Sequence, residues 1–336
     1  MHSRNQPEAS LTKEVTIMND VCKMLNIQYP IIQGGMGNIS NAQLTSAVSN
    51  AGGLGTIGCG TMTPEEVDRI ITETKERTDK PFAVNIALAV SPHAEELINL
   101  VIKHKVPIVS LSAGNPAPYI PRLHEHGIKV MTLVASVKHA KKAEEAGADI
   151  LVAEGYEAAG INSNLELTTF TLIPQIVQNV NIPVLAAGGI GDGKGLAATL
   201  MLGAIGVQMG TRFIATQEAP FHDNYKNKVL EANGTGTVII GRTVGQIRRI
   251  LNTPYAEKIT NLEKSGLTQD QYRDMTSEEL HARGALEGDL DNGFLNSGQV
   301  AGLITDIPTV QELIEGMVYQ ASEQMQSQLK NLTLNT

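Results

Sequence analysis

The chain has 336 residues and is 42% hydrophobic, which suits one large α/β domain with a modest appendage. Its 26 lysines and arginines against 35 aspartates and glutamates give a net charge of −9, so neither nucleic acid nor an anionic membrane is an expected partner. Two cysteines, Cys22 and Cys59, favour a reducing, cytoplasmic location, and no apolar run approaches the ~20 residues of a transmembrane helix. Residues 1–17 are polar, lack the apolar core of a signal peptide and are expected to form a loose extension.

Eight short apolar runs, each closed by a turn of glycine or other small residues, predict eight strands buried on both faces. These runs cover residues 30–33, 54–58, 82–89, 108–112, 129–136, 149–154, 183–187 and 205–209. Helical patterns lie between them, at residues 41–50, from Thr63 with Pro64 in the first turn, and at 94–104, 119–126, 137–146, 168–180 and 195–202. This strict alternation predicts a TIM (β/α)8 barrel rather than an open, doubly wound sheet.

The strand–helix alternation stops after Phe213. Residues 18–213 are therefore expected to supply the eight barrel strands, and residues 214–295 a small, mainly helical inserted domain whose strand-length apolar run is 236–241. Residues 296–336 would return the chain to the barrel and form its last helix, an amphipathic stretch at 309–329.

The strongest functional signal is a pair of glycine turns that follow the seventh and eighth apolar runs, Gly188-Gly189 and Gly210-Thr211. In a (β/α)8 barrel these two loops commonly bind a phosphate, because bare backbone N–H groups can approach an anion closely. The sequence contains neither a GxxxxGK[ST] loop nor a GxGxxG turn after the first strand, so other nucleotide folds are not supported.

Other candidate contacts follow earlier strands, at the same face of the barrel. The turn Gly34-Gly35-Met36 would let a flat ring lie against the backbone, or is a simple tight turn. Asn85, a polar residue within an apolar run, would bind the edge of a heteroaromatic ring, or belongs to an internal hydrogen-bond network.

Two further positions complete this set. Gly114 lies in a small-residue turn at 113–116 that would admit a ligand, although a plain turn is the alternative. Glu154 ends an apolar run and would accept hydrogen bonds from sugar-alcohol hydroxyls, or cap the turn that follows. The eight histidines show no HxxxH or HExxH spacing, and no GxSxG motif occurs, so neither a metal site nor a serine hydrolase is expected.

Taken together, these motifs resemble the nitronate monooxygenase (2-nitropropane dioxygenase) family, to which FMN-dependent enoyl-ACP reductases also belong. The resemblance implies a TIM barrel with a small added domain, bound FMN, and NADH or NADPH as a reductant. The tail motifs Glu287-Gly288-Asp289 and Gly298-Gln299 resemble the reductase branch. The positions that the resemblance and the turns assign to cofactor binding are Gly34, Gly35, Met36, Asn85, Gly114, Glu154, Gly160, Ala187, Gly188, Gly189, Met209, Gly210 and Thr211.

One position departs from the family's pattern. The family carries a histidine, its acid/base beside the flavin, in a segment like Glu-x-Glu-Ala-Gly-Gly-His, and here Ile161 takes that place. An isoleucine cannot transfer a proton, so Asn162 and Ser163 are the candidate catalytic residues, with Tyr156 as a further group that could organise a water.

Three functions follow from these motifs. The first is an FMN-dependent oxidoreductase of nitronate monooxygenase type, acting on a small anionic or activated substrate that needs no protein base. The second is an NAD(P)H-dependent enoyl-ACP (enoyl-thioester) reductase. The third, from another class, is a non-redox phosphate-binding barrel enzyme. In each case the expected partner is a small molecule, and a homodimer is left open.

Overall fold

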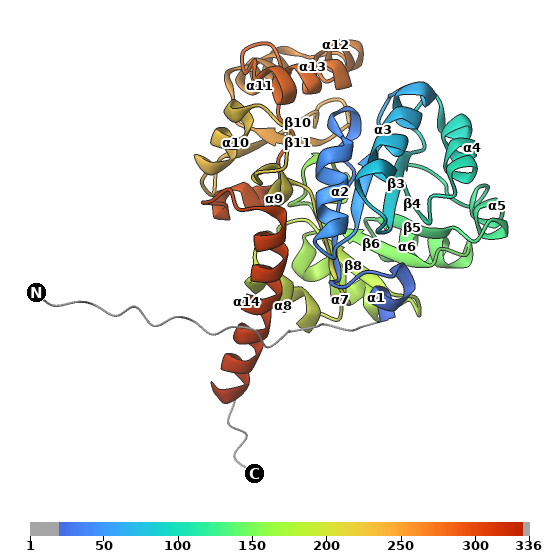
Figure 1. Ribbon diagram of the computed structural model, residues 1–336. Coiled ribbons are helices and arrows are strands. Elements are labelled where there is room, and N and C mark those ends of the chain that lie inside the picture. Colours follow the sequence, from blue (N-terminus) through green and yellow to red (C-terminus); the bar gives the residue numbers. More distant parts are fainter. Residues whose placement is uncertain (1–19, 332–336) are drawn as a thin grey trace, which may run out of the picture.

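Eight parallel strands form the centre of the structure, a computed structural model that describes residues 20–331 (Figure 1). The predicted extension 1–17 lies outside the described residues. The strands are β1 (Ile31–Gln33), β2 (Gly55–Gly58), β3 (Phe82–Ala87), β4 (Ile108–Ser112), β5 (Lys129–Val134), β6 (Ile150–Glu154), β8 (Val184–Ala187) and β9 (Val207–Met209). Each falls within one of the eight predicted apolar runs, because strands covered on both faces need continuous apolar sequence.

The strands close on themselves. Their order is β1-β9-β8-β6-β5-β4-β3-β2, and β1 meets the start of β2 through a parallel bridge between Ile32 and Leu54. Two backbone hydrogen bonds hold this seam, from Gln33 N–H to the Leu54 carbonyl (2.9 Å) and from Leu54 N–H to the Ile31 carbonyl (3.0 Å). The predicted TIM-barrel fold is therefore confirmed.

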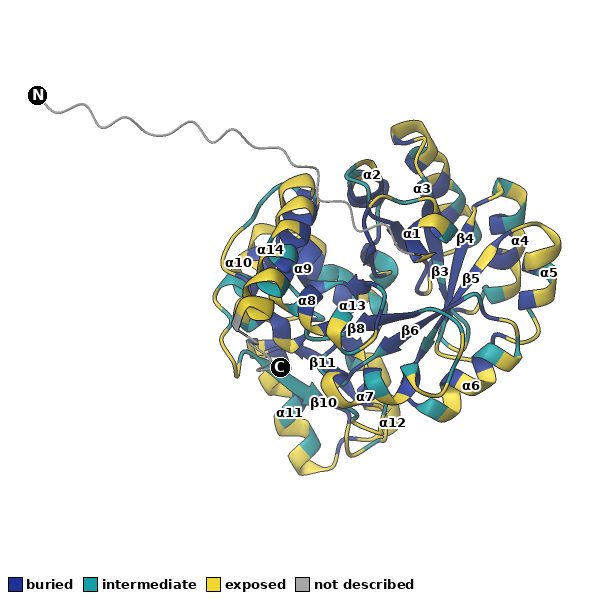
Figure 2. Cartoon of the chain, turned by 90° about the horizontal axis from the view of Figure 1, so that it is seen from below, coloured by how far each residue is buried: buried dark blue, intermediate teal, exposed yellow. Residues whose placement is uncertain are grey.

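Helices surround the barrel, and their outer sides are exposed while the strands are buried (Figure 2). They are α2 (Ala42–Asn50), α3 (Pro64–Arg77), α4 (Ala94–His104), α5 (Ile120–Glu125), α6 (Val137–Glu145), α7 (Thr169–Val177), α8 (Gly193–Met201) and α14 (Val310–Asn331), which packs on α8. At the start of α3, Thr63 and Glu66 form a reciprocal capping box with Pro64 in the first turn, as its sequence predicts. Within residues 20–331, no helix is both long and apolar enough to span a membrane.

A short helix closes one end of the barrel. Helix α1 (Asp20–Leu25), which the sequence analysis did not predict, places Val21 and Leu25 in the same buried cluster as the strand residues Ile32 and Ile108. Its six residues are too few to show a helical repeat, so its sequence carries little periodic signal. The barrel interior is therefore packed at this end, and a ligand must enter from the other.

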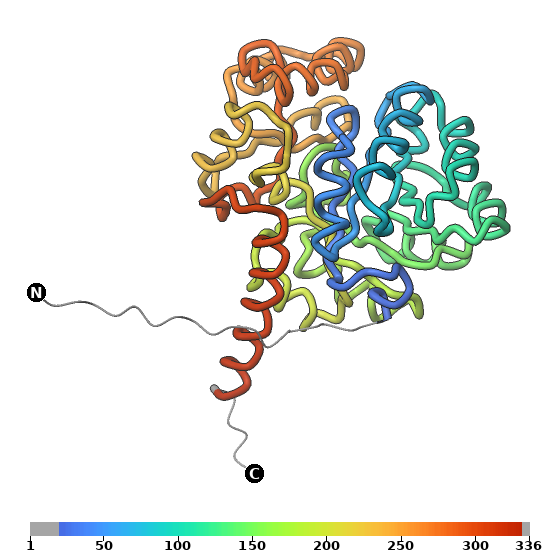
Figure 3. The backbone as a smooth tube through the Cα atoms, in the orientation of Figure 1, coloured from blue at the N-terminus to red at the C-terminus, as the bar shows by residue number. Residues whose placement is uncertain are grey.

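The segment after β9 lies at the opposite end of the molecule from α1 (Figure 3), and its part from residue 238 to 294 has a buried core of its own. Its helices are α9 (Thr211–Ile214), α10 (Asp223–Leu230), α11 (Pro254–Ser265), α12 (Gln269–Met275) and α13 (Glu278–Ala282). It also contains an antiparallel sheet of β10 (Thr237–Ile240), β11 (Arg248–Leu251) and β7 (Gly160–Ile161), the last contributed by the loop after β6. We refer to residues 214–295 as the inserted segment.

Two of those three strands were not predicted. Strand β11 begins with two arginines, Arg248 and Arg249, so it lacks an apolar run, and β7 has two residues. Three short helical segments are also present: the 3-10 helices η1 (Gly37–Ile39) and η3 (Gln299–Leu303), and the π-helix η2 (Arg283–Glu287).

Candidate active site

A cavity of about 1110 Å³ opens at the carboxyl ends of the barrel strands, with walls from the loops that follow all eight of them. We call it the barrel pocket. Every position assigned to the cofactor lines it, as do Asn162, Ser163 and Ile161. Tyr156 is not among the lining residues; its hydroxyl accepts a hydrogen bond from Arg242 Nη2 instead. The described structure thus brings these motifs, which are scattered in the sequence, to one place. That each residue contacts a ligand remains a prediction.

The two glycine turns after β8 and β9 form part of the pocket wall. Gly188 and Gly189 have φ values of +92° and +76°, a left-handed conformation that other residues rarely adopt. A side chain at Gly188 would also lie 2.8 Å from the Gly155 carbonyl oxygen, whereas one at Gly210 would meet no atom within 4 Å. The wall at Gly210 is therefore open to a ligand, as a phosphate cradle requires.

The turn after β1 has a simpler explanation than ligand contact. A side chain at Gly35 would lie 2.7 Å from Asn85 Cβ and 3.0 Å from Gly58 Cα, and one at Gly34 would lie 3.3 Å from Gln208. Packing against the neighbouring strands is therefore enough to require glycine here. Gly114 is similar, because its Cβ would lie 2.6 Å from Leu88 Cβ.

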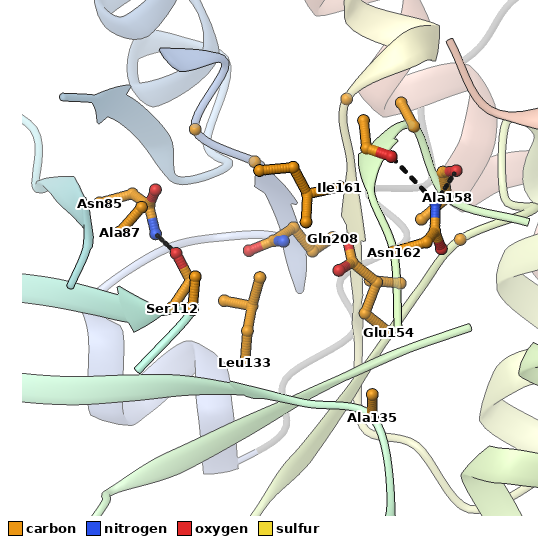
Figure 4. Close-up of a pocket in the computed structure, with 18 of the residues that line it drawn as sticks. Asn85, Ala87, Ser112, Leu133, Ala135, Glu154, Ala158, Ile161, Asn162 and Gln208 are labelled. Carbon is orange, nitrogen blue, oxygen red and sulfur yellow. Dashed lines mark hydrogen bonds between the residues drawn. The ribbon is translucent and has the colours of Figure 1, made fainter. Parts of the chain in front are cut away.

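Asn85 belongs to an internal network and still faces the pocket (Figure 4). Its Nδ2 donates to the Ser110 carbonyl, Ser110 Oγ and Ser112 Oγ, each at 3.2 Å. Within the described residues no donor reaches its Oδ1, so this oxygen can accept a hydrogen bond from a bound ring.

Glu154 is a carboxylic acid without a protein hydrogen-bond partner among the described residues, at the end of β6. Burial raises its pKa to about 7. Glu154 does not cap the turn that follows it, and the start of α7 is capped by Glu157, whose carboxylate accepts from Thr169 N–H at 2.9 and 3.1 Å and from the Thr169 hydroxyl at 3.0 Å. Glu154 is left facing the pocket (Figure 4), where hydroxyl donors of a ligand would satisfy it.

The loop that carries Ile161 does not fold away from the pocket mouth. Ile161 is 52% exposed and lines the cavity (Figure 4). Asn162 Nδ2 donates to the Ala158 and Gly160 carbonyls at 3.0 and 3.2 Å, and Ser163 Oγ accepts from Leu165 N–H at 3.2 Å. These bonds brace the loop itself, so a catalytic role for Asn162 and Ser163 stays a prediction.

The inserted segment and the return segment add residues that the sequence analysis missed. Four of them line the pocket and contact one another: Arg248 of β11, Glu278 and His281 of α13, and Asn296. We call these four the roof cluster. They come from three separate stretches of chain, and the only local signal is the i, i+3 spacing of Glu278 and His281 on α13.

Glu278 holds the roof cluster and the barrel together. Its Oε1 lies 3.9 Å from Arg248 Nη2 and its Oε2 lies 3.8 Å from His281 Nδ1. Its Oε2 also accepts from Asn38 N–H, at 3.5 Å, in the turn after β1. Burial alone would raise the pKa of this carboxyl, but His281, Arg248 and the Asn38 N–H outweigh it and lower the pKa to about 2. Glu278 is therefore ionised throughout the physiological range.

Across residues 20–331, no three His, Cys, Asp or Glu side chains converge in a way that could hold a metal ion.

The chain is similar to several known proteins. The family model described as nitronate monooxygenase matches residues 19–97 and 90–320. A (3aS,4S,5R,7aS)-5-hydroxy-7a-methyl-1-oxo-octahydro-1H-indene-4-carboxyl-CoA dehydrogenase from Rhodococcus jostii is 34% identical, over 91% of this chain and 96% of its own. A probable nitronate monooxygenase from Staphylococcus saprophyticus is 33% identical, over 91% and 98%. The structure of FabK from Thermotoga maritima superposes with a TM-score of 0.88 at 43% identity, covering 94% of this chain and all (100%) of that one.

Proposed function

This chain belongs to the nitronate monooxygenase family and is an oxidoreductase, and on that premise we propose that it binds FMN and reduces the carbon–carbon double bond of an enoyl thioester. The thioester would be carried by CoA or by an acyl carrier protein, and NADH or NADPH would be the reductant. The family is generally flavin-dependent, and we choose FMN among the flavins because of the features of the pocket described next.

The fit of the pocket to FMN rests on three features of this chain. The open wall at Gly210, beside the left-handed Gly188 and Gly189, suits one phosphate group. Glu154 lacks a protein hydrogen-bond partner among the described residues and would accept from the ribityl hydroxyls. Asn85 Oδ1 would accept from the N–H of the flavin ring. Bound there, the flavin would supply two-electron transfer between a nicotinamide and the substrate.

The observation that carries the choice of substrate is the size of the pocket. Its volume of about 1110 Å³ exceeds the ~300–1,000 Å³ typical of a site for one drug-sized ligand. A nitronate of a few atoms needs little of the space that a flavin leaves, whereas an acyl chain and its thioester arm need much more. The pocket also has apolar side chains, among them Met36, Leu133 and Ile161, which suit an acyl chain. The similarity to FabK and to a dehydrogenase of a carboxyl-CoA supports the same substrate class.

Nitronate oxidation is the second candidate, and Ile161 favours it. A nitronate is already an anion, so its oxidation needs no side chain to remove a proton, and the isoleucine in the histidine's place would be no obstacle. The similarity to a probable nitronate monooxygenase supports this reading.

Anaerobic stopped-flow spectroscopy of the flavin separates the two. NADH, NADPH and propyl nitronate are mixed in parallel with the oxidised protein, and the reduced protein is then mixed with crotonyl-CoA. Fast reduction by NADH or NADPH followed by reoxidation by crotonyl-CoA supports the thioester reductase. Reduction by propyl nitronate alone supports the second candidate, and a folded, colourless protein that takes up no added FMN contradicts both.

A further inference from the structure

The barrel pocket contains a histidine that no sequence motif indicates. His281 in α13 lines the cavity although only 2% of its surface is exposed to solvent. Its ring stacks on Phe294, with the ring centroids 5.3 Å apart and the planes inclined by 17°. The Arg248 guanidinium also lies over the Phe294 ring, 5.0 Å from the centroid of that ring. The imidazole is therefore held in one orientation and is not a freely turning surface group.

The amide of Asn296 lies against the same ring. Asn296 Nδ2 lies 3.4 Å from His281 Nδ1 and 3.3 Å from its Nε2. Asn296 is in turn held by Arg248, whose Nη1 donates to Asn296 Oδ1 at 3.2 Å, and by the Tyr225 hydroxyl, which donates to the Asn296 carbonyl. The Glu278 carboxylate lies 3.8 Å from His281 Nδ1 and completes the contacts of the ring.

Asn296 links this imidazole to the segment that contains Ile161. A side chain at Gly160 would lie 3.6 Å from the Asn296 amide, and that amide lies 3.3 Å from His281 Nε2. Ile161, the next residue, pairs with Arg248 of the roof cluster. His139 of α6 also lines the cavity, and within the described residues it forms no ion pair with a member of the roof cluster.

We propose that His281 is the acid that donates the proton in thioester reduction, in place of the histidine that Ile161 replaces. The proposal rests on the proposed function. The β-carbon of the enoyl thioester gains a hydride that originates from the dihydronicotinamide, and the π electron pair shifts onto the α-carbon and the thioester carbonyl. A ring N–H of the His281 imidazolium breaks as a C–H bond forms at the α-carbon, and the neutral imidazole regains its proton from water. Glu278 and Asn296 are positioning residues for this step.

The test compares His281→Gln with His139→Gln, a matched change at the other pocket histidine. Both variants are expected to retain bound FMN and to be reduced by NADH or NADPH at the wild-type rate. Reoxidation by crotonyl-CoA should slow by about 100-fold or more in His281→Gln and stay within about twofold in His139→Gln, as loss of a general acid predicts. Glu278→Gln should change the pH profile of reoxidation, because it removes the carboxylate that lies 3.8 Å from His281 Nδ1.

A measurement on the unmodified holoprotein covers the case in which His281→Gln does not fold. Diethyl pyrocarbonate labels histidines, and mass spectrometry locates the label. Butyryl-CoA, the saturated product, is expected to protect His281 and to leave the surface residue His124 labelled as before. Equal labelling of His281 with and without butyryl-CoA, or reoxidation of His281→Gln at the wild-type rate, would overturn the proposal. Wild-type protein that is reduced by NADH and NADPH but never reoxidised by an enoyl thioester would overturn the proposed function with it.

Discussion

Ile161 of β7 stands directly opposite Arg248 of β11, in an antiparallel pair that joins the loop after β6 to the inserted segment. The Cβ atoms of two residues opposite each other in such a pair lie about 5 Å apart. Both residues also line the barrel pocket, so a residue placed at position 161 lies near the Arg248 side chain, and its chemistry depends on that charge.

Ile161→His is expected to confer oxidation of neutral nitropropane. A nearby guanidinium disfavours the imidazolium, so the new imidazole would be neutral at pH 7 and able to remove a proton. We expect at least about a 100-fold gain over wild type on nitropropane, with little change on propyl nitronate, which needs no base. Oxygen uptake with each substrate measures both rates, and Ile161→Gln is the control. Equal rates of wild type and Ile161→His on neutral nitropropane would show that another residue already acts as the base.

Gly210→Asp is expected to abolish FMN binding while the fold is retained. The new carboxylate would face the open wall and the phosphate, and like charges ~4 Å apart repel by about 4 kcal/mol at intermediate dielectric. Gly210→Ala is the matched control, because its methyl group would meet no protein atom within 4 Å. The flavin released by denaturation, compared with protein concentration, gives the occupancy. An Asp variant that keeps full occupancy would place the phosphate elsewhere.

Glu154 should make the flavin-free protein less stable as pH rises from about 5 to 8. Its pKa is about 7 in the folded protein, above the ordinary value of 4.5, so the folded state binds the proton more tightly. The resulting stabilisation is present at low pH and is lost as pH rises through 7, by up to about 3 kcal/mol. Urea unfolding at several pH values measures it. Glu154→Gln should flatten this dependence, whereas the same change at the exposed Glu145 should not; an unchanged slope in Glu154→Gln would contradict the assignment.

Gly55→Ala and Gly316→Ala are expected to change stability in opposite directions. An added Cβ at Gly55 would lie 1.9 Å from the Thr45 carbonyl oxygen, a backbone atom that cannot move aside, so we expect a loss of at least about 3 kcal/mol. Gly316 is exposed within α14, and a Cβ there meets no atom within 4 Å, so alanine should stabilise by up to about 1 kcal/mol. Thermal unfolding of both variants measures the difference, and a Gly55→Ala protein as stable as wild type would contradict the packing around β2.

The barrel was predictable because each strand carries its own signal. Residues 150–153 and 184–187 are apolar throughout, and the glycines that follow these strands, Gly155 and Gly188, mark the pocket mouth. The candidate residues on these turns could be gathered into one pocket because strand ends of a barrel share one face.

The roof cluster could not be predicted in the same way. Arg248 lies in strand β11, whose two arginines interrupt the apolar pattern by which a buried strand is predicted. Its partner Glu278 is 30 residues further along the chain, on a five-residue helix. Such contacts depend on how the inserted segment packs over the barrel, which no local pattern records. Glu157 shows the same limit at short range. Its carboxylate caps the start of α7, although the sequence analysis named Glu154, not Glu157, as a candidate capping residue.

The phosphate cradle and the roof cluster lie on different parts of the chain. The cradle is built from barrel turns, whereas Arg248, Glu278 and His281 all belong to residues 214–295. Under the proposed function, retention of the cofactor would depend on the barrel turns, and proton transfer would depend on the inserted segment. An exchange of the inserted segment between two relatives should carry proton chemistry and substrate preference with it, while the recipient barrel keeps its own affinity for the cofactor.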